Sequence, residues 1–188
     1  MSRPFSGAVL VGGRSRRFGR DKARYLWRGR SLLEHVLMSL GDAEERFLVG
    51  DRPYPEFGLA TYPDPEPGVG PLAGVEAALA HARHRLVAVA ACDLPRLRPE
   101  FWAYLLAAMG EAPAVASAGP DGEVEPLAAV YTRRLLPELT RARARGVRSL
   151  RAFWAGLGGR VLPFAATARL FGPEIFLNAN RPEDLQNA

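Results

Sequence analysis

The sequence predicts a single α/β domain with a doubly wound, mostly parallel β-sheet of the Rossmann-like kind. Apolar segments without helical spacing alternate with segments at helical spacing over the first half of the chain, which is typical of right-handed β-α-β units. The run 86–91 (LVAVAA) is continuously apolar, as in a central strand that helices cover on both faces. A chain of 188 residues that is 48% hydrophobic and 24% charged suits one domain with a sizeable core.

The first half of the chain carries the predicted β-α-β units. Besides 86–91, strands are expected over 6–11, 46–49 and 59–62. A helix is expected from Ser31, because Ser31 and Glu34 can form a capping box ahead of apolar residues at helical spacing. Pro71 suits the first turn of a second helix over 72–84.

The second half is expected to continue with a helix, two strands and a closing strand, over 99–109, 114–118, 127–131 and 161–164. A turn at Asp121-Gly122 joins the two strands, and one or two helices follow Thr132. In a doubly wound sheet, ligands bind at the carboxyl ends of the strands, where the strand order reverses. The loops after residues 11 and 91 are therefore the expected places for a functional site.

Composition excludes several classes of protein. Cys92 is the only cysteine, which excludes an intrachain disulfide and a Cys-rich zinc site and fits a reducing compartment. No apolar segment reaches transmembrane length, so we expect a cytoplasmic protein with no membrane partner. The net charge of +5 is modest for a nucleic-acid binder, and no nucleic-acid partner is expected. Basic residues gather over 14–22 and 133–151, which indicates two anionic ligands or a solvated basic surface.

The loop over 10–22 (LVGGRSRRFGRDK) combines glycines with positive charge. Its glycines let backbone N–H groups approach an anion, and its basic residues suit a triphosphate: Arg14, Arg16, Arg17, Arg20 and Lys22. Gly13 and Gly19 are one residue too far apart for a Walker A loop, and a dinucleotide fingerprint is absent. A generic glycine-rich turn with solvated arginines is the alternative.

Carboxylates follow two of the predicted strands. Asp93 comes directly after 86–91, where a carboxylate is well placed to hold Mg²⁺, although a capping or loop aspartate is the alternative. Asp64 stands between two prolines, which by itself indicates a turn. The three histidines form no convincing metal set.

Two further segments offer polar groups for a second ligand. Arg148 belongs to the second basic patch, where arginines could bind a phosphate or simply be solvated. Asn178 and Asn180 would project on one side of an extended segment and offer amide groups to a ligand, or mark a strand end before a capped helix.

The pattern Leu-x-Gly-Gly-x-Ser-x-Arg-x-Gly-x-Asp-Lys over 10–22 resembles the signature loop of the molybdenum cofactor guanylyltransferases, which have a doubly wound nucleotidyltransferase fold. Three more strings are similar to that family: Gly-Pro-Leu-Ala-Gly at 70–74, Cys-Asp-x-Pro at 92–95 and Asn-x-Asn-x-Pro-Glu-Asp-Leu at 178–185. The resemblance covers essentially the whole chain. Departures are Val11 for the usual alanine, Phe18 for methionine, and Gly50-Asp51 where the family has an asparagine.

The resemblance implies a role for each matching residue. The residues that bind GTP would be Leu10, Val11, Gly12, Gly13, Lys22, Asp64 and Asp93. Lys22 and Arg17 would stabilise charge on the triphosphate, and Asp93 would hold the cofactor Mg²⁺. The residues that bind molybdopterin would be Arg148, Asn178 and Asn180. Residues 1–95 would then form mainly the nucleotide-binding half of the single domain 1–188, and 96–188 mainly the acceptor-binding half.

The implied reaction is transfer of GMP from GTP to the terminal phosphate of molybdenum-molybdopterin, with release of pyrophosphate. Contacts with molybdoenzymes or other cofactor-synthesis proteins would suit that role. Alternatives are a nucleotidyltransferase with another base or acceptor, such as cytidylyl transfer to molybdopterin or a sugar-phosphate acceptor, and a non-catalytic GTP-binding adaptor.

Overall fold

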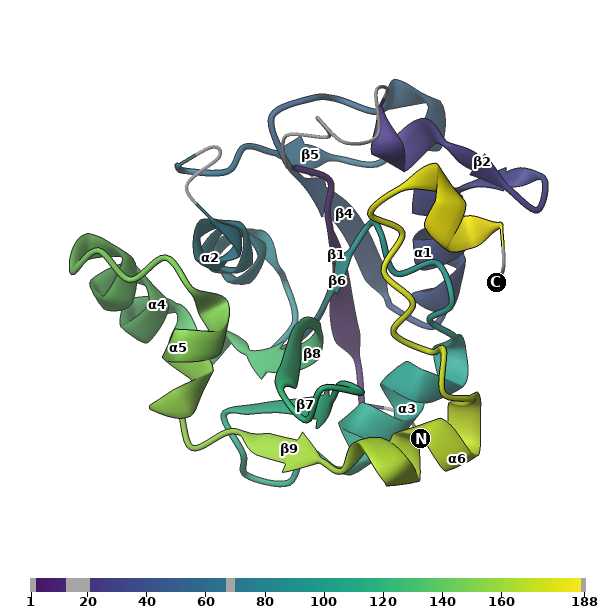
Figure 1. Ribbon diagram of the computed structural model, residues 1–188. Helices are drawn as coiled ribbons and strands as arrows, with labels where there is room; N and C mark the ends of the chain where they lie inside the picture. Colours follow the sequence, from purple (N-terminus) through teal and green to yellow (C-terminus); the bar gives the residue numbers. More distant parts are fainter. Residues whose placement is uncertain (1–2, 13–20, 67–69, 187–188) are drawn as a thin grey trace.

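The computed structural model describes residues 3–12, 21–66 and 70–186 of the chain (Figure 1). Its centre is a seven-stranded sheet in the order β5-β4-β1-β6-β8-β7-β9. In chain order its strands are β1 (Phe5–Leu10), β4 (Glu45–Val49), β5 (Thr61–Tyr62), β6 (Leu86–Ala91), β7 (Ala114–Ala118), β8 (Val124–Thr132) and β9 (Arg160–Leu162). A separate hairpin is formed by β2 (Leu26–Trp27) and β3 (Arg30–Ser31).

The sheet is parallel except at β8, which runs antiparallel to both β6 and β7. From β1 the chain moves outward to β4 and β5, and then returns to place β6 on the other side of β1. The strand order therefore reverses between β1 and β6, whose last residues Leu10 and Ala91 are paired. This confirms the doubly wound sheet and puts the switch point at the two predicted loops.

Helices cover both faces of the sheet (Figure 1). One face carries α1 (Leu32–Ser39), α3 (Pro99–Ala107) and α6 (Phe164–Phe171). The other face carries α2 (Pro71–His81), α4 (Leu136–Ala144) and α5 (Leu150–Ala155). Short 3₁₀ helices lie at Lys22–Arg24, Pro55–Phe57, Arg133–Leu135 and Pro182–Leu185. No helix within the described ranges is long and apolar enough to cross a membrane.

Local sequence signals located most of these elements. Ser31 caps α1 as predicted: its side chain accepts from the Glu34 N–H, and the Glu34 carboxylate accepts from the Ser31 N–H at 2.6 Å. The closing strand β9 ends at Leu162, earlier than expected, because Pro163 has no N–H to donate to the sheet. Pro163 instead becomes the N-cap of α6, a helix that was not predicted. The β2–β3 hairpin was also not predicted, since its turn places Arg28 at a positive φ of 48°, where asparagine or glycine is the usual signal.

Candidate active site

The site begins where β1 and β4 end side by side. The Val11 N–H donates to the Val49 carbonyl oxygen at 2.9 Å, so the strand pairing continues past Leu10. A Cβ atom at Gly50 would lie 2.9 Å from Cγ2 of Val11, which leaves room only for glycine. Gly12 is different, because a Cβ there would meet no atom of the described residues within 4 Å. Val11 and Gly50 thus form a closely packed floor beside Gly12.

Lys22 and Asp93 form the centre of the site. Lys22 Nζ lies 2.8 Å from Asp93 Oδ2, and the two side chains are only 13% and 21% exposed. Lys22 follows the glycine- and arginine-rich loop, whereas Asp93 follows β6. The ion pair therefore joins the loops of the two strands at the switch point.

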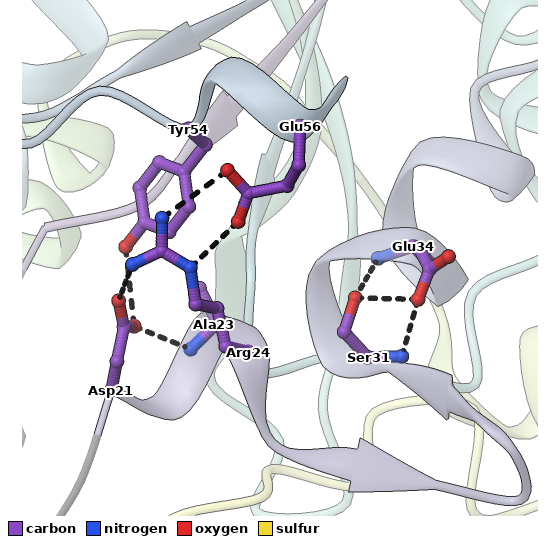
Figure 2. A network of polar contacts seen from close by, with 7 residues as sticks. All are labelled: Asp21, Ala23, Arg24, Ser31, Glu34, Tyr54 and Glu56. Atoms are coloured by element: carbon purple, nitrogen blue, oxygen red, sulfur yellow. Dashed lines mark hydrogen bonds and ion pairs between the residues drawn. The ribbon is translucent and has the colours of Figure 1, made fainter.

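The segment that bears Lys22 is held in place by Asp21 (Figure 2). The Asp21 carboxylate accepts hydrogen bonds from the Ala23 N–H at 3.1 Å and from the Tyr54 hydroxyl at 3.2 Å, and it pairs with Arg24 at 3.0 Å. Arg24 also donates to Glu56 at 2.6 Å and lies over the Tyr54 ring. This anchor was missed in the sequence, although the position of Asp21 directly before Lys22 was a usable signal.

The C-terminal segment completes the centre. The Ala179 N–H donates to the Asp93 carbonyl oxygen at 2.9 Å, and Lys22 Nζ donates to Asn180 Oδ1 at 3.3 Å. Lys22, Asp93 and Asn180 are thus brought together from three distant parts of the sequence. Asn178 is exposed beside them, and its carbonyl oxygen accepts from the Asn180 N–H at 2.9 Å.

The Asp93 carboxylate has the features of a metal ligand. Oδ2 accepts from Lys22, but Oδ1 is buried and has no hydrogen-bond partner within the described part of the chain. A buried polar atom without a partner calls for an explanation, such as an ion that is held there. Mg²⁺ takes one or two protein carboxylates together with phosphate oxygens and waters, so a single carboxylate oxygen at this position fits it.

Cys92 is not a candidate nucleophile. Burial, together with the neighbouring Asp93 carboxylate, raises the pKa of the Cys92 thiol to about 12. A thiol with such a pKa stays protonated near neutral pH, and the thiolate is the reactive form. Cys92 is therefore a small buried core residue, as its sequence context indicated.

Asp64 and Arg148 are linked through Glu66. Asp64 Oδ1 accepts from the Glu66 N–H at 2.8 Å, and burial, with smaller contributions from nearby carboxylates, raises the Asp64 pKa. Both Arg148 and Arg143 pair with the Glu66 carboxylate, at 3.2 Å and 3.1 Å. A Cβ at Gly70 would lie 2.8 Å from the Arg148 carbonyl oxygen, so Arg148 packs at the start of α2. Arg148, which was assigned to the acceptor, therefore lies next to the loop of Asp64, which was assigned to the nucleotide.

Two predicted site residues fall outside the described part of the chain, and two of the histidines make local contacts. Gly13 and Arg17 belong to 13–20, outside the described residues. His35 Nε2 is 2.8 Å from the Trp27 carbonyl oxygen, and His81 stacks on the Tyr62 ring with centroids 3.8 Å apart. Within 3–12, 21–66 and 70–186, no three His, Cys, Asp or Glu side chains come close enough to hold a metal ion by themselves.

Comparison with known proteins gives consistent matches over nearly the whole chain. The family model described as "MobA-like NTP transferase domain" matches residues 7–161. A probable molybdenum cofactor guanylyltransferase of Deinococcus radiodurans is 40% identical over 186 residues, which cover 97% of this chain and 92% of the relative. A second, from Opitutus terrae, is 36% identical and covers 95% and 92%.

Solved structures agree with these relatives. The crystal structure of molybdopterin-guanine dinucleotide biosynthesis protein A from Archaeoglobus fulgidus superimposes with a TM-score of 0.80 at 29% identity, covering 97% of this chain and 95% of that one. A 2-C-methyl-D-erythritol 4-phosphate cytidylyltransferase from Thermus thermophilus has a TM-score of 0.71 at 23% identity and covers 100% and 97%, which supports the fold alone.

Proposed function

The chain belongs to the MobA-like NTP transferase family, a family of nucleotidyltransferases, and we propose that it transfers GMP from GTP to the terminal phosphate of molybdenum-molybdopterin. The products would be pyrophosphate and the guanine dinucleotide form of the cofactor. The observation that carries this proposal is the meeting of Lys22, Asp93 and Asn180 at the switch point, with Asp93 Oδ1 left for an ion.

The chemistry requires alignment and charge neutralisation more than a protein base. The acceptor phosphate is already an anion and can attack the α-phosphorus of GTP directly, in line with the departing pyrophosphate. Lys22 would neutralise charge on the triphosphate as it develops in the transition state. Asp93 would hold Mg²⁺, which when bound supplies Lewis-acid neutralisation of the phosphate oxygens. Their ion pair at 2.8 Å keeps both groups in position before the substrates bind.

The nucleotide would lie over the carboxyl ends of β1, β4 and β5. Leu10, Val11 and Gly12 would line it, as the family resemblance implies. From the sequence match, Gly13 and Arg17 would continue this contact. Asp64 would contact the nucleotide from the loop after β5.

The acceptor would approach from the side of the C-terminal segment. Asn180 already contacts Lys22, and the exposed Asn178 lies beside it. The Arg148 side chain is 44% exposed, and its guanidinium could bind a phosphate group. Because Arg148 is paired with Glu66, its release from that carboxylate would accompany binding.

The experiment that tests the nucleotide assignment is calorimetric titration with GTP, CTP and ATP in the presence of Mg²⁺. GTP should bind most tightly, and Lys22→Ala should weaken binding or turnover by about 10- to 150-fold, from the roughly 1.5–3 kcal/mol of a lost charged contact. Arg169→Ala, which removes an exposed positive charge on α6, is the control and should bind GTP normally. Tighter binding of CTP or ATP than of GTP would overturn the base assignment.

A further inference from the structure

The segment that bears Lys22 is contacted from both strands that flank β1. In the sheet, β1 lies between β4 and β6, and residues 21–24 follow β1. From the β6 side, Asp93 pairs with Lys22 Nζ at 2.8 Å. From the β4 side, the hydroxyl of Tyr54, in the loop after β4, donates to Asp21 Oδ1 at 3.2 Å. Lys22 is therefore held at its amine by Asp93, while the residue before it is held by Tyr54.

Tyr54 is itself fixed in the core. It is 2% exposed, and its ring belongs to the same apolar cluster as Ala23 and Cys92. The Arg24 guanidinium lies over this ring, 4.7 Å from its centroid. Burial, with smaller contributions from Asp21 and Cys92, raises the pKa of the Tyr54 hydroxyl. The hydroxyl therefore stays protonated near neutral pH and remains a donor to Asp21.

Asp21 connects Tyr54 to the turn that carries Lys22. It is the N-cap of the short 3₁₀ helix over 22–24, so its side chain closes this turn. The same oxygen, Oδ1, accepts from the Tyr54 hydroxyl and from the Ala23 N–H at 3.1 Å (Figure 2). The position of the Asp21 carboxylate, and with it the start of the Lys22 side chain, therefore depends on Tyr54.

The other contacts of Asp21 lie nearer the surface. Its Oδ2 pairs with Arg24 at 3.0 Å, and Arg24 makes a two-point contact with Glu56 at 2.6 Å and 3.2 Å (Figure 2). The side chains of Arg24 and Glu56 are 46% and 43% exposed, and ion pairs between exposed groups contribute little to stability. Tyr54 is the buried member of this network, so it is the one most able to fix Asp21 in a single position.

We propose that Tyr54 is a positioning residue that, by holding Asp21, fixes the Lys22 amine where it meets the triphosphate. The inference rests on the role proposed above for Lys22. A cation stabilises developing charge best when it is already in place, and a small displacement of a catalytic group lowers the rate considerably. Tyr54 lies outside the four strings that resemble the family, so that resemblance assigns it no role.

The test is a double-mutant cycle between Tyr54→Phe and Lys22→Ala. Tyr54→Phe removes only the hydroxyl and keeps the ring beneath Arg24. In the wild-type background it should weaken GTP binding in the presence of Mg²⁺, measured by calorimetry, by about 3- to 10-fold, the effect of one hydrogen bond. In the Lys22→Ala background it should change GTP affinity by less than about twofold, because no amine is left to misplace.

Ser39→Ala is the matched control, since it also removes one buried hydroxyl. The Ser39 hydroxyl accepts from Trp102 Nε1 at 3.0 Å at the end of α1, where the next residue, Leu40, packs against Gly7 near the start of β1. It is thus at the opposite edge of the sheet from Lys22. Ser39→Ala should lower the Tm by at least as much as Tyr54→Phe, because it leaves the Trp102 N–H without its acceptor, and it should bind GTP normally.

The outcomes separate this inference from the function on which it rests. Normal GTP affinity in Tyr54→Phe, whatever its Tm, would refute the inference and leave Tyr54 a structural residue. Equal weakening in both backgrounds would also refute it, because Tyr54 would then act independently of Lys22. Since the cycle needs no acceptor, it still decides the role of Tyr54 if the wild type binds GTP but transfers no GMP to molybdopterin, in which case the proposed function alone fails. A wild-type protein that does not bind GTP would refute both.

Discussion

Replacing Asp93 by asparagine should have a small effect on the stability of the protein and a large effect on its catalytic rate. Asparagine keeps the shape and an acceptor oxygen for Lys22, but it removes the negative charge that would hold Mg²⁺. In the structure the ion pair is short, at 2.8 Å, and its side chains are 13% and 21% exposed. In the variant, Lys22 donates to a neutral amide oxygen instead of a carboxylate. This change should lower the free energy of unfolding by roughly 1 kcal/mol.

Because Lys22 retains its contact with Asn180, the loss in Asp93→Asn should not leave a charge stranded. For a domain of this size, roughly 1 kcal/mol corresponds to a fall in Tm of about 2–4 °C. The catalytic loss should be much larger. Removing one preorganised electrostatic group from an active site costs on the order of 10²–10³ in kcat.

The assay is transfer of GMP at saturating GTP over a range of Mg²⁺ concentrations, with the Tm measured on the same preparations. Glu45→Gln is the matched control: Glu45 is 13% exposed and pairs with Arg83 at 3.0 Å, at the amino end of β4 and so at the opposite edge of the sheet. It should lower the Tm by a similar amount and leave transfer unchanged. A folded Asp93→Asn variant with wild-type turnover at ordinary Mg²⁺ would falsify the metal assignment.

Two further predictions follow from pKa shifts. Burial alone would raise the Glu45 pKa, but hydrogen bonds from the Ser6 hydroxyl and the Arg83 N–H lower it overall below 4.5. The stability that Glu45 contributes should therefore be complete above about pH 4.5 and should be lost as the pH falls through the pKa of Glu45 in the folded protein. Below about pH 4.5, the Tm of Glu45→Gln should therefore change less with pH than the Tm of the wild type. Cys92, with its pKa raised to about 12, should not react with a thiol reagent in the native protein at pH 8, and should react after unfolding in guanidinium. Rapid native labelling would contradict its burial.

Features that depend on neighbouring residues could be predicted from the sequence. The Ser31–Glu34 capping box and the start of α2 at Pro71 rest on interactions within one helical turn, and both are present. The hairpin turn at Arg28 was missed because arginine is an unusual residue at positive φ. Helix α6 was missed because Pro163 both ends the strand and starts the helix, which a strand pattern alone does not reveal.

The candidate site depends on long-range contacts, which spacing alone cannot give. Lys22 and Asp93 are separated by 71 positions, and only the predicted doubly wound topology indicated that their two loops would meet. Lys22 and Asn180 are separated by 158 positions, and their meeting could be expected only from the family resemblance.

The measurement that tests the central proposal most directly is the fate of the α-phosphate of GTP. The wild-type protein is incubated with Mg²⁺, molybdopterin and each of the four nucleoside triphosphates in turn, labelled at the α-phosphorus. We expect the label to enter the acceptor from GTP alone, with one pyrophosphate released for each label transferred and no transfer when Mg²⁺ is chelated. Transfer from CTP in preference to GTP, or GTP binding with no transfer to molybdopterin, would contradict the proposed function.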